Sequence, residues 1–170
     1  MAKILIIDDE AVFARSAAHF LSRNGHECWS LSSAEEGLAI IEKERPDLVL
    51  LDIKLAGMSG LEALKRIAGL DPNAIVIIMT AYSSVESAVA AMKDGAYDYI
   101  QKPIDHDELK FTIEKALETR RLRERLSYFQ RKEVQQSAHL DLIGTSPQMK
   151  QIIDLIERIA NLEPGTAGDL

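Results

Sequence analysis

The sequence contains a single cysteine, Cys28, so the chain cannot form an internal disulfide. It also lacks any apolar run near the ~20 residues that a membrane-spanning helix needs. It begins with a strand-like run rather than with a signal peptide. Positive charge is in short supply, because 20 Lys and Arg face 27 Asp and Glu and the net charge is −7. These absences predict a cytoplasmic protein without membrane contact, and they argue against broad non-specific binding of nucleic acid.

Proline and glycine are absent between Pro103 and Gly144, so nothing in that stretch breaks a helix. Residues 114–133 hold seven Lys and Arg and four Asp and Glu. They also hold a short a/d-type seam made of Leu122, Leu126 and Phe129. We predict a basic, amphipathic linker helix over residues 119–139 that breaks at Leu140 to Gly144. Two interpretations stay open, a dimeric coiled coil and a solvated helix that lies alone.

Five short apolar runs recur before this linker, at residues 3–8, 26–31, 47–52, 74–80 and 97–102. Three of them are apolar almost throughout, which is typical of strands buried on both faces of a parallel sheet. The gaps carry helical periodicity at residues 11–23, 34–44, 60–69 and 85–94. Helix start signals of the form Ser/Asp-x-x-Glu begin at Ser33, Ser59, Ser83 and Asp105. The pattern predicts a doubly wound α/β domain over residues 1–118.

Acidic residues stand where two of the apolar runs end. Asp8 and Asp9 end the first run, ahead of Glu10, and Asp52 ends the third. In an open parallel sheet ligands bind at the carboxyl ends of the strands, so neighbouring strands would bring these carboxylates into one cleft. Two unit charges ~4 Å apart repel by roughly 4 kcal/mol at an effective dielectric constant of 20. A cation is therefore expected, and oxygen ligands without His or Cys favour Mg²⁺.

Two further polar residues end the remaining runs, Thr80 on the fourth and Lys102 on the fifth. A hydroxyl, an ammonium, a metal and a spare carboxylate together suit phosphoryl transfer, with a carboxylate as nucleophile. Each residue alone has an ordinary explanation, such as a helix cap for an Asp or a solvent-facing position for a Lys. Their convergence at one edge of one sheet favours a common site.

The segments IIDDE, LLDIKLAGMSGLE, MTAY and YDYIQKP resemble the receiver domain of two-component response regulators. The resemblance implies a flavodoxin-like, five-stranded parallel sheet of order 2-1-3-4-5 flanked by five helices. It implies that Asp52 is the phosphoacceptor and that a sensor histidine kinase is the partner. The roles it assigns to other residues are Mg²⁺ binding by Asp8, Asp9, Asp52 and the backbone carbonyl of Lys54, phosphoryl binding by Thr80 and Lys102, and an aromatic switch at Tyr99.

Further details follow from the same resemblance. The Lys102–Pro103 peptide is expected to be cis. Lys54 and Tyr82 lie where this family varies its dephosphorylation rate. Ala56 replaces the proline that is usual in the loop after the phosphoacceptor, so that loop is expected to be more flexible. Phosphorylation would draw in Thr80, let Tyr99 turn inward and reshape a homodimer face formed by the fourth helix, the fifth strand and the fifth helix.

The segment DLIGTSPQMKQIIDLIERIA resembles the opening of the AAA+ ATPase domain in sigma-54-dependent activators of the nitrogen-regulatory protein C type. We therefore expect residues 140–161 to begin such a domain, with a helix at 147–160, and residues 162–170 to be a disordered tail. A stray amphipathic helix is the alternative. No G-x-x-x-x-G-K-[ST] phosphate loop is present. We expect a truncated chain that neither hydrolyses ATP nor contacts DNA, and that reaches sigma-54 RNA polymerase only through missing domains.

Two other functions compete with a phosphorylation switch for a transcriptional activator. Aspartate-nucleophile phosphohydrolases also combine a strand-end Asp with Mg²⁺, but they typically carry D-x-D at the first strand, where this chain has adjacent Asp8 and Asp9. A stand-alone receiver acting as a phosphorelay or scaffold is the second. The long basic helix and the ATPase-like segment argue against it.

Overall fold

The computed structural model describes the backbone of residues 1–81 and 84–144, and side chains as far as Tyr128. The chain divides into two compact units, Met1–Arg123 and Glu124–Leu170. The described part of the second unit consists only of the continuation of one helix. The site residues expected from the sequence all belong to the first unit.

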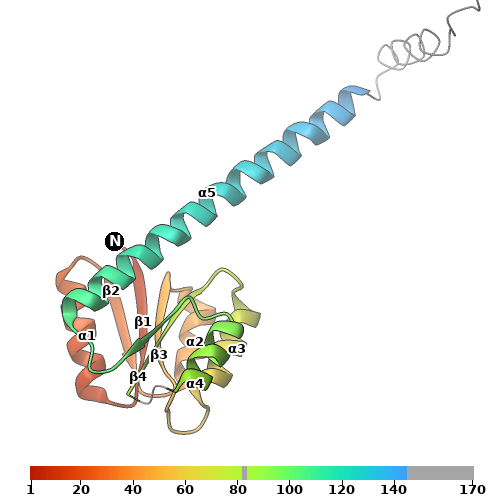
Figure 1. Ribbon diagram of the computed structural model, residues 1–170. Coiled ribbons are helices and arrows are strands. Elements are labelled where there is room, and N and C mark those ends of the chain that lie inside the picture. The colour runs from red at the N-terminus through yellow and green to blue at the C-terminus, as the bar shows by residue number, and fades with distance from the viewer. Residues whose placement is uncertain (82–83, 145–170) are drawn as a thin grey trace, which may run out of the picture. The chain divides into compact units, whose positions relative to one another are not determined.

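The first unit is built on a parallel sheet of five strands in the order β2-β1-β3-β4-β5 (Figure 1). The strands are β1 (Lys3–Ile7), β2 (Glu27–Leu31), β3 (Leu48–Asp52), β4 (Ile75–Thr80) and β5 (Asp98–Gln101). Every neighbouring pair is parallel, and β1 lies between β2 and β3. This confirms the predicted fold and strand order, and it makes the first and third strands neighbours.

Helices cover both faces of the sheet (Figure 1). They are α1 (Ala11–Arg23), α2 (Ala34–Glu44), α3 (Gly60–Leu70), α4 (Val85–Lys93) and α5 (His106–Gly144). One core packs α1 and the start of α5 against alternate residues of the strands, such as Ile4 and Ile6 of β1. The other core packs α2, α3 and α4 against the intervening residues, such as Leu5 and Ile7. Burial of both faces explains the nearly continuous apolar runs.

The helix starts agree with the sequence signals except at α4. Ser33 and Ser59 each accept a hydrogen bond at the side-chain oxygen from the backbone N–H three residues on. The prediction of Ser83 as a cap was wrong by one residue, because Ser84 forms a reciprocal capping box with Ser87. Ser87 thus takes the place that the sequence pattern gave to an acidic partner. Ser83 lies outside the described residues.

The fifth helix is longer than predicted. It is described through Gly144, so the break expected over Leu140 to Gly144 does not begin before Gly144. Its sequence offers no proline or glycine before Gly144, and leucine, glutamate, lysine and arginine are good helix formers. Leu122 and Leu126 are exposed, as either form of the linker helix over 119–139 requires. The predicted helix at 147–160, most of the ATPase-like segment 140–161 and the tail at 162–170 lie outside the described residues.

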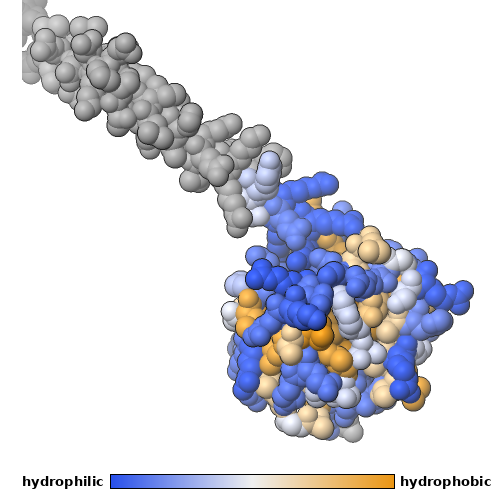
Figure 2. All heavy atoms as spheres, turned by 180° about the vertical axis from the view of Figure 1, so that it is seen from behind, coloured by the Kyte–Doolittle hydropathy of each residue, from blue (hydrophilic) through white to orange (hydrophobic). Residues whose placement is uncertain are grey.

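On the face opposite to the one shown in Figure 1, hydrophilic residues cover most of the surface and surround a smaller hydrophobic area (Figure 2). Among the residues that the structure describes, no helix combines the length and the apolar character needed to span a membrane.

Candidate functional site

The candidate site lies at the carboxyl ends of β1, β3, β4 and β5. Ile7 pairs with Leu51 in the β1–β3 register, so Asp8 and Asp52 follow on adjacent strands. Asp8 has none of its surface exposed and Asp52 has 4%. Thr80 at the end of β4 is also fully buried. Charged and polar groups are rarely buried without partners, so this edge of the sheet is a built site.

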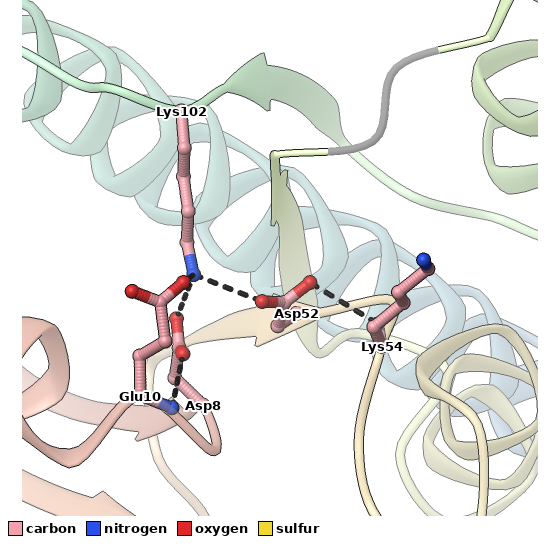
Figure 3. Close-up of polar contacts among 5 residues, drawn as sticks. All are labelled: Asp8, Glu10, Asp52, Lys54 and Lys102. Atoms are coloured by element: carbon pink, nitrogen blue, oxygen red, sulfur yellow. Dashed lines mark hydrogen bonds and ion pairs between the residues drawn. The ribbon is translucent and has the colours of Figure 1, made fainter.

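Lys102 holds the acidic groups together (Figure 3). Its Nζ lies 2.7 Å from Oδ2 of Asp8 and 2.9 Å from Oδ2 of Asp52. It also lies 3.3 Å from Oε1 of Glu10. The lysine stem passes Phe13, whose ring centroid is 4.6 Å from Nζ. A single ammonium therefore compensates carboxylates that come from two neighbouring strands and the loop after the first.

The pKa values of Asp8 and Lys102 reflect this burial. Burial raises the pKa of Asp8 above its ordinary value, and the hydrogen bond and charge of Lys102 offset only part of the rise. For Lys102, burial alone would lower the pKa, but the hydrogen bonds and charges of Asp8 and Asp52 outweigh it, so the pKa is raised. Lys102 thus stays protonated across the neutral range and supplies a permanent positive charge beside Asp52.

The third carboxylate of the cluster is that of Glu10, not that of Asp9. Oxygen atoms of Asp8, Glu10 and Asp52 all lie within 4.8 Å of one another, whereas Asp9, which is exposed as Glu10 is, does not belong to this group. The backbone N–H of Glu10 donates to Oδ1 of Asp8 at 3.0 Å, which turns the chain after β1. The DDE sequence offered Glu10 as a third acid, but only the turn shows which acid faces the cleft.

The donor set fits a hard divalent cation. Asp8, Glu10 and Asp52 provide only oxygen atoms at the required mutual spacing. Oδ2 of Asp8 is buried and lies 2.7 Å from the ammonium of Lys102. The oxygen-only donor set agrees with the Mg²⁺ expected from the sequence, and Lys102 supplies positive charge to the same acids.

The backbone around Asp52 is closely packed. The backbone N–H of Lys54 donates to Oδ1 of Asp52 at 3.1 Å. Gly60 at the start of α3 has no room for a side chain, because a Cβ there would overlap the carbonyl of Asp52. The Lys102–Pro103 peptide is cis, as expected. These contacts fix the direction in which Asp52 and Lys102 face each other.

The two predicted switch residues lie on β4 and β5. Thr80 pairs with Gln101 in the register, and its carbonyl accepts a hydrogen bond from the backbone N–H of Lys102 at 2.9 Å. Tyr99 is half-buried, and its hydroxyl lies 3.3 Å from Oγ of Ser87 in the capping box of α4. The sequence did not indicate this contact. Tyr82 lies outside the described residues.

Comparison with curated proteins finds transcriptional regulators. The chain is 37% identical over 158 residues to the transcriptional regulatory protein ZraR of Salmonella typhimurium, an alignment that covers 92% of this chain and 34% of ZraR. It is 31% identical over 180 residues to the DNA-binding transcriptional regulator NtrC of the same species, covering 98% of this chain and 36% of NtrC. The chain therefore spans about a third of the length of these relatives.

Solved structures give the same result. NtrX from Brucella abortus superposes with a TM-score of 0.73 at 37% identity, covering 94% of this chain and 35% of NtrX. A CheY-like receiver domain protein from Methanospirillum hungatei superposes with a TM-score of 0.71 at 36% identity, covering 72% of this chain and 98% of its own. Residues 4–114 match the response regulator receiver domain. On the strength of that match, together with the fold and the relatives, the chain belongs to the response regulator receiver family.

Proposed function

We propose that Asp52 accepts a phosphoryl group from a phosphohistidine of a sensor histidine kinase. The observation that carries this proposal is the buried contact of 2.9 Å between the Asp52 carboxylate and the Lys102 ammonium, beside Asp8 on the neighbouring strand. A permanently charged ammonium beside a carboxylate at a strand end is the arrangement that an in-line phosphoryl transfer needs.

In the proposed reaction a carboxylate oxygen of Asp52 attacks phosphorus and the P–N bond of the phosphohistidine breaks. The bonding electrons leave with the imidazole, and Asp52 becomes an acyl phosphate. Asp8, Glu10 and Asp52 would hold Mg²⁺, with the backbone carbonyl of Lys54 as a further ligand. When bound, the metal neutralises charge on the phosphoryl oxygens. Lys102 supplies a second positive charge to the same oxygens, and Thr80 donates a hydrogen bond from its hydroxyl.

The consequence of phosphorylation is electrostatic. The charge at Asp52 changes from −1 to roughly −2, by the magnitude known for phosphorylated hydroxyls, and strong acceptor oxygens are added. Thr80 is drawn toward them, which frees space for Tyr99 to turn inward and leave Ser87. The face of α4, β5 and α5 would then change its geometry as the surface of a homodimer. Its exposed apolar residues include Val85, Val89, Met92 and Phe111.

The output belongs to domains that lie beyond this chain in its relatives. We infer a sigma-54 activator, because the relatives ZraR and NtrC are transcriptional regulators and because residues 140–161 resemble the start of an AAA+ domain. In this proposal residues 119–139 form the linker helix that carries the change in dimer geometry onward. The chain itself acts as a regulatory domain, with catalysis limited to self-phosphorylation and autodephosphorylation at Asp52.

The test is phosphorylation by acetyl phosphate, or binding of the phosphoryl mimic beryllofluoride, in the presence of Mg²⁺. Intact-mass measurement should show one added phosphoryl group on the wild-type chain and none on Asp52→Asn. Sedimentation should show altered association. The variants Glu10→Gln and Asp9→Asn distinguish the metal ligands: weaker Mg²⁺ binding in the first supports the cluster of Asp8, Glu10 and Asp52, and weaker binding in the second supports the Asp9 ligand that the resemblance implies. Phosphate uptake by Asp52→Asn would disprove the phosphoacceptor, and multiple turnover of a small phosphomonoester would favour a phosphohydrolase.

A further inference from the structure

The loop between β3 and α3, residues 53–59, follows Asp52 directly and is fixed at both ends. At its start the backbone N–H of Lys54 donates to Oδ1 of Asp52 at 3.1 Å. At its end the N–H of Gly60 donates to the carbonyl of Ile53 at 2.8 Å. Lys54 belongs to this loop, so whatever fixes the middle of the loop also affects the backbone that flanks the phosphoacceptor.

The middle of the loop is held by a side chain from another element. The backbone N–H of Met58 donates to Oε1 of Glu35 at 3.1 Å. The residue before it, Gly57, has a φ of +84°, which side-chain-bearing residues rarely adopt. A Cβ on Gly57 would also lie 3.0 Å from the same Oε1. The glycine thus makes the turn and leaves room for the carboxylate.

The backbone of Glu35 is held in place because α2 is packed tightly on β1. Ala34 is fully buried, and Ser33 caps the helix by accepting from the N–H of Glu36. Gly37 sits so close to β1 that a Cβ there would overlap the side chain of Ile7. Ile7 is the last residue of the strand that leads into Asp8. The backbone of Glu35 is therefore anchored beside the strand that supplies one acid of the site, and its exposed carboxylate reaches the loop that follows the other.

We propose that Glu35 is a positioning residue for the phosphorylation site. Its carboxylate tethers the β3–α3 loop to α2, and so sets the position of the Lys54 backbone beside Asp52. This loop carries Ala56, which does not restrict φ as a proline would. The tether from α2 supplies from outside the rigidity that the loop lacks within its own backbone. The inference rests on the proposed function, because it gives Lys54 a place in the phosphorylation site.

The experiment compares Glu35→Ala and Glu35→Gln with Glu36→Ala, an exposed acid on the same first turn of α2, as the matched control. The first readout is hydrogen exchange of the Met58 amide in metal-free protein. The second is the Mg²⁺ dissociation constant from calorimetry. In Glu35→Ala we expect Met58 to exchange about tenfold faster and the dissociation constant to rise about threefold to tenfold, as for the loss of one hydrogen bond. Glu35→Gln should retain most of both, since its amide oxygen still accepts, and Glu36→Ala should match wild type.

Two results would overturn the inference. One is a Met58 amide that stays protected in Glu35→Ala, and the other is a Mg²⁺ dissociation constant within twofold of wild type in that variant. Exchange at Leu64 in α3 checks that any change is confined to the loop rather than caused by general unfolding. If Asp52→Asn still takes up phosphate, the proposed function fails instead, while the Met58 measurement still decides whether the tether exists.

Discussion

Replacing Lys102 with Met tests how the buried acids of the site are compensated. The ammonium of Lys102 contacts Asp8 and Asp52, and the side chains of all three are at most 7% exposed. Methionine keeps much of the length of the lysine stem and can still pack on Phe13, but it removes the charge. The variant therefore leaves two buried carboxylates without their counter-ion while changing the shape of the site little.

The expected loss is large. Breaking a buried ion pair by removing one partner typically costs about 3–5 kcal/mol, because the remaining charge stays desolvated. Solvent screens the charges of these two carboxylates only weakly, since Asp8 is fully buried and Asp52 nearly so. The apolar methionine offsets about 1 kcal/mol through better transfer from water. In the absence of metal at neutral pH, the free energy of unfolding should therefore fall by about 2–4 kcal/mol.

The sign of the pH dependence follows from the pKa of Asp8. Burial already raises that pKa above the ordinary 3.8, and removing Lys102 removes a cause that lowers it. An acid whose pKa is higher in the folded state lowers stability as pH rises from its unfolded pKa to its folded pKa, so the cost is absent at low pH and complete above the folded value. The deficit of Lys102→Met should therefore shrink as pH falls from 7.5 toward 4. The contribution of Lys102 to wild type is present at neutral pH and is lost only above pH 10.5, because its folded pKa is raised.

Urea unfolding of both proteins at pH 7.5 and pH 5, with and without Mg²⁺, measures these effects. Binding to the folded state alone adds about 2.7 kcal/mol at a ligand concentration of 100 times the dissociation constant. Mg²⁺ should thus recover much of the loss in Lys102→Met and stabilise it more than wild type. Lys110→Met, at an exposed position on α5, is the control and should change little. If neither the lower pH nor Mg²⁺ reduces the loss of unfolding free energy in Lys102→Met, the loss comes from packing rather than from charge. That result would refute the electrostatic explanation.

Three other variants test neighbouring parts of the structure. Gly60→Ala should lose about 1–3 kcal/mol in urea unfolding, since its Cβ would overlap the backbone of Asp52, whereas Gly69→Ala in the same helix meets nothing and should gain about 0.5–1 kcal/mol. Ser87→Ala removes one contact of the Tyr99 hydroxyl, so ring NMR signals of Tyr99 should shift toward those of the beryllofluoride-bound form; unchanged signals would show that Ser87 does not hold Tyr99 in its present position. Arg120→Ala removes hydrogen bonds to the carbonyls of Pro46 and Asp47, and should lower the unfolding free energy by about 1–3 kcal/mol, while Arg120→Lys should recover only part of it.

The sequence predicted the sheet and most of the site because both depend on local patterns. Strands buried on both faces read as apolar runs, and residues such as Asp52 that end them must meet at one edge. The choice between Asp9 and Glu10 could not be made in this way. It depends on the turn in which the backbone of Glu10 bonds to Asp8, and adjacent acids look alike in a sequence.

Long-range contacts explain the other differences. The contact of Glu35 with Met58 joins residues 23 positions apart, and no local sequence pattern predicts it. The N-cap of α4 lies one residue after the predicted one. Ser87 takes the place of the acid in the capping box, a variant that the Ser-x-x-Glu pattern does not include. In both cases a tertiary or side-chain partner decided the outcome where several sequence positions were equally suitable.

The location of the proposed switch follows from the position of Lys102 directly after β5. Lys102 belongs to the segment after β5, which is an edge strand of only four residues and is less buried than β3 or β4. Its backbone N–H is bonded to the carbonyl of Thr80, and Tyr99 lies three residues before it. A change in the charge beside Lys102 therefore acts on β5, which is short and pairs with one neighbouring strand. Edge segments with few buried contacts rearrange at the lowest free-energy cost, so a phosphoryl group at Asp52 should reshape β5 and the Tyr99 contact before it disturbs the centre of the sheet.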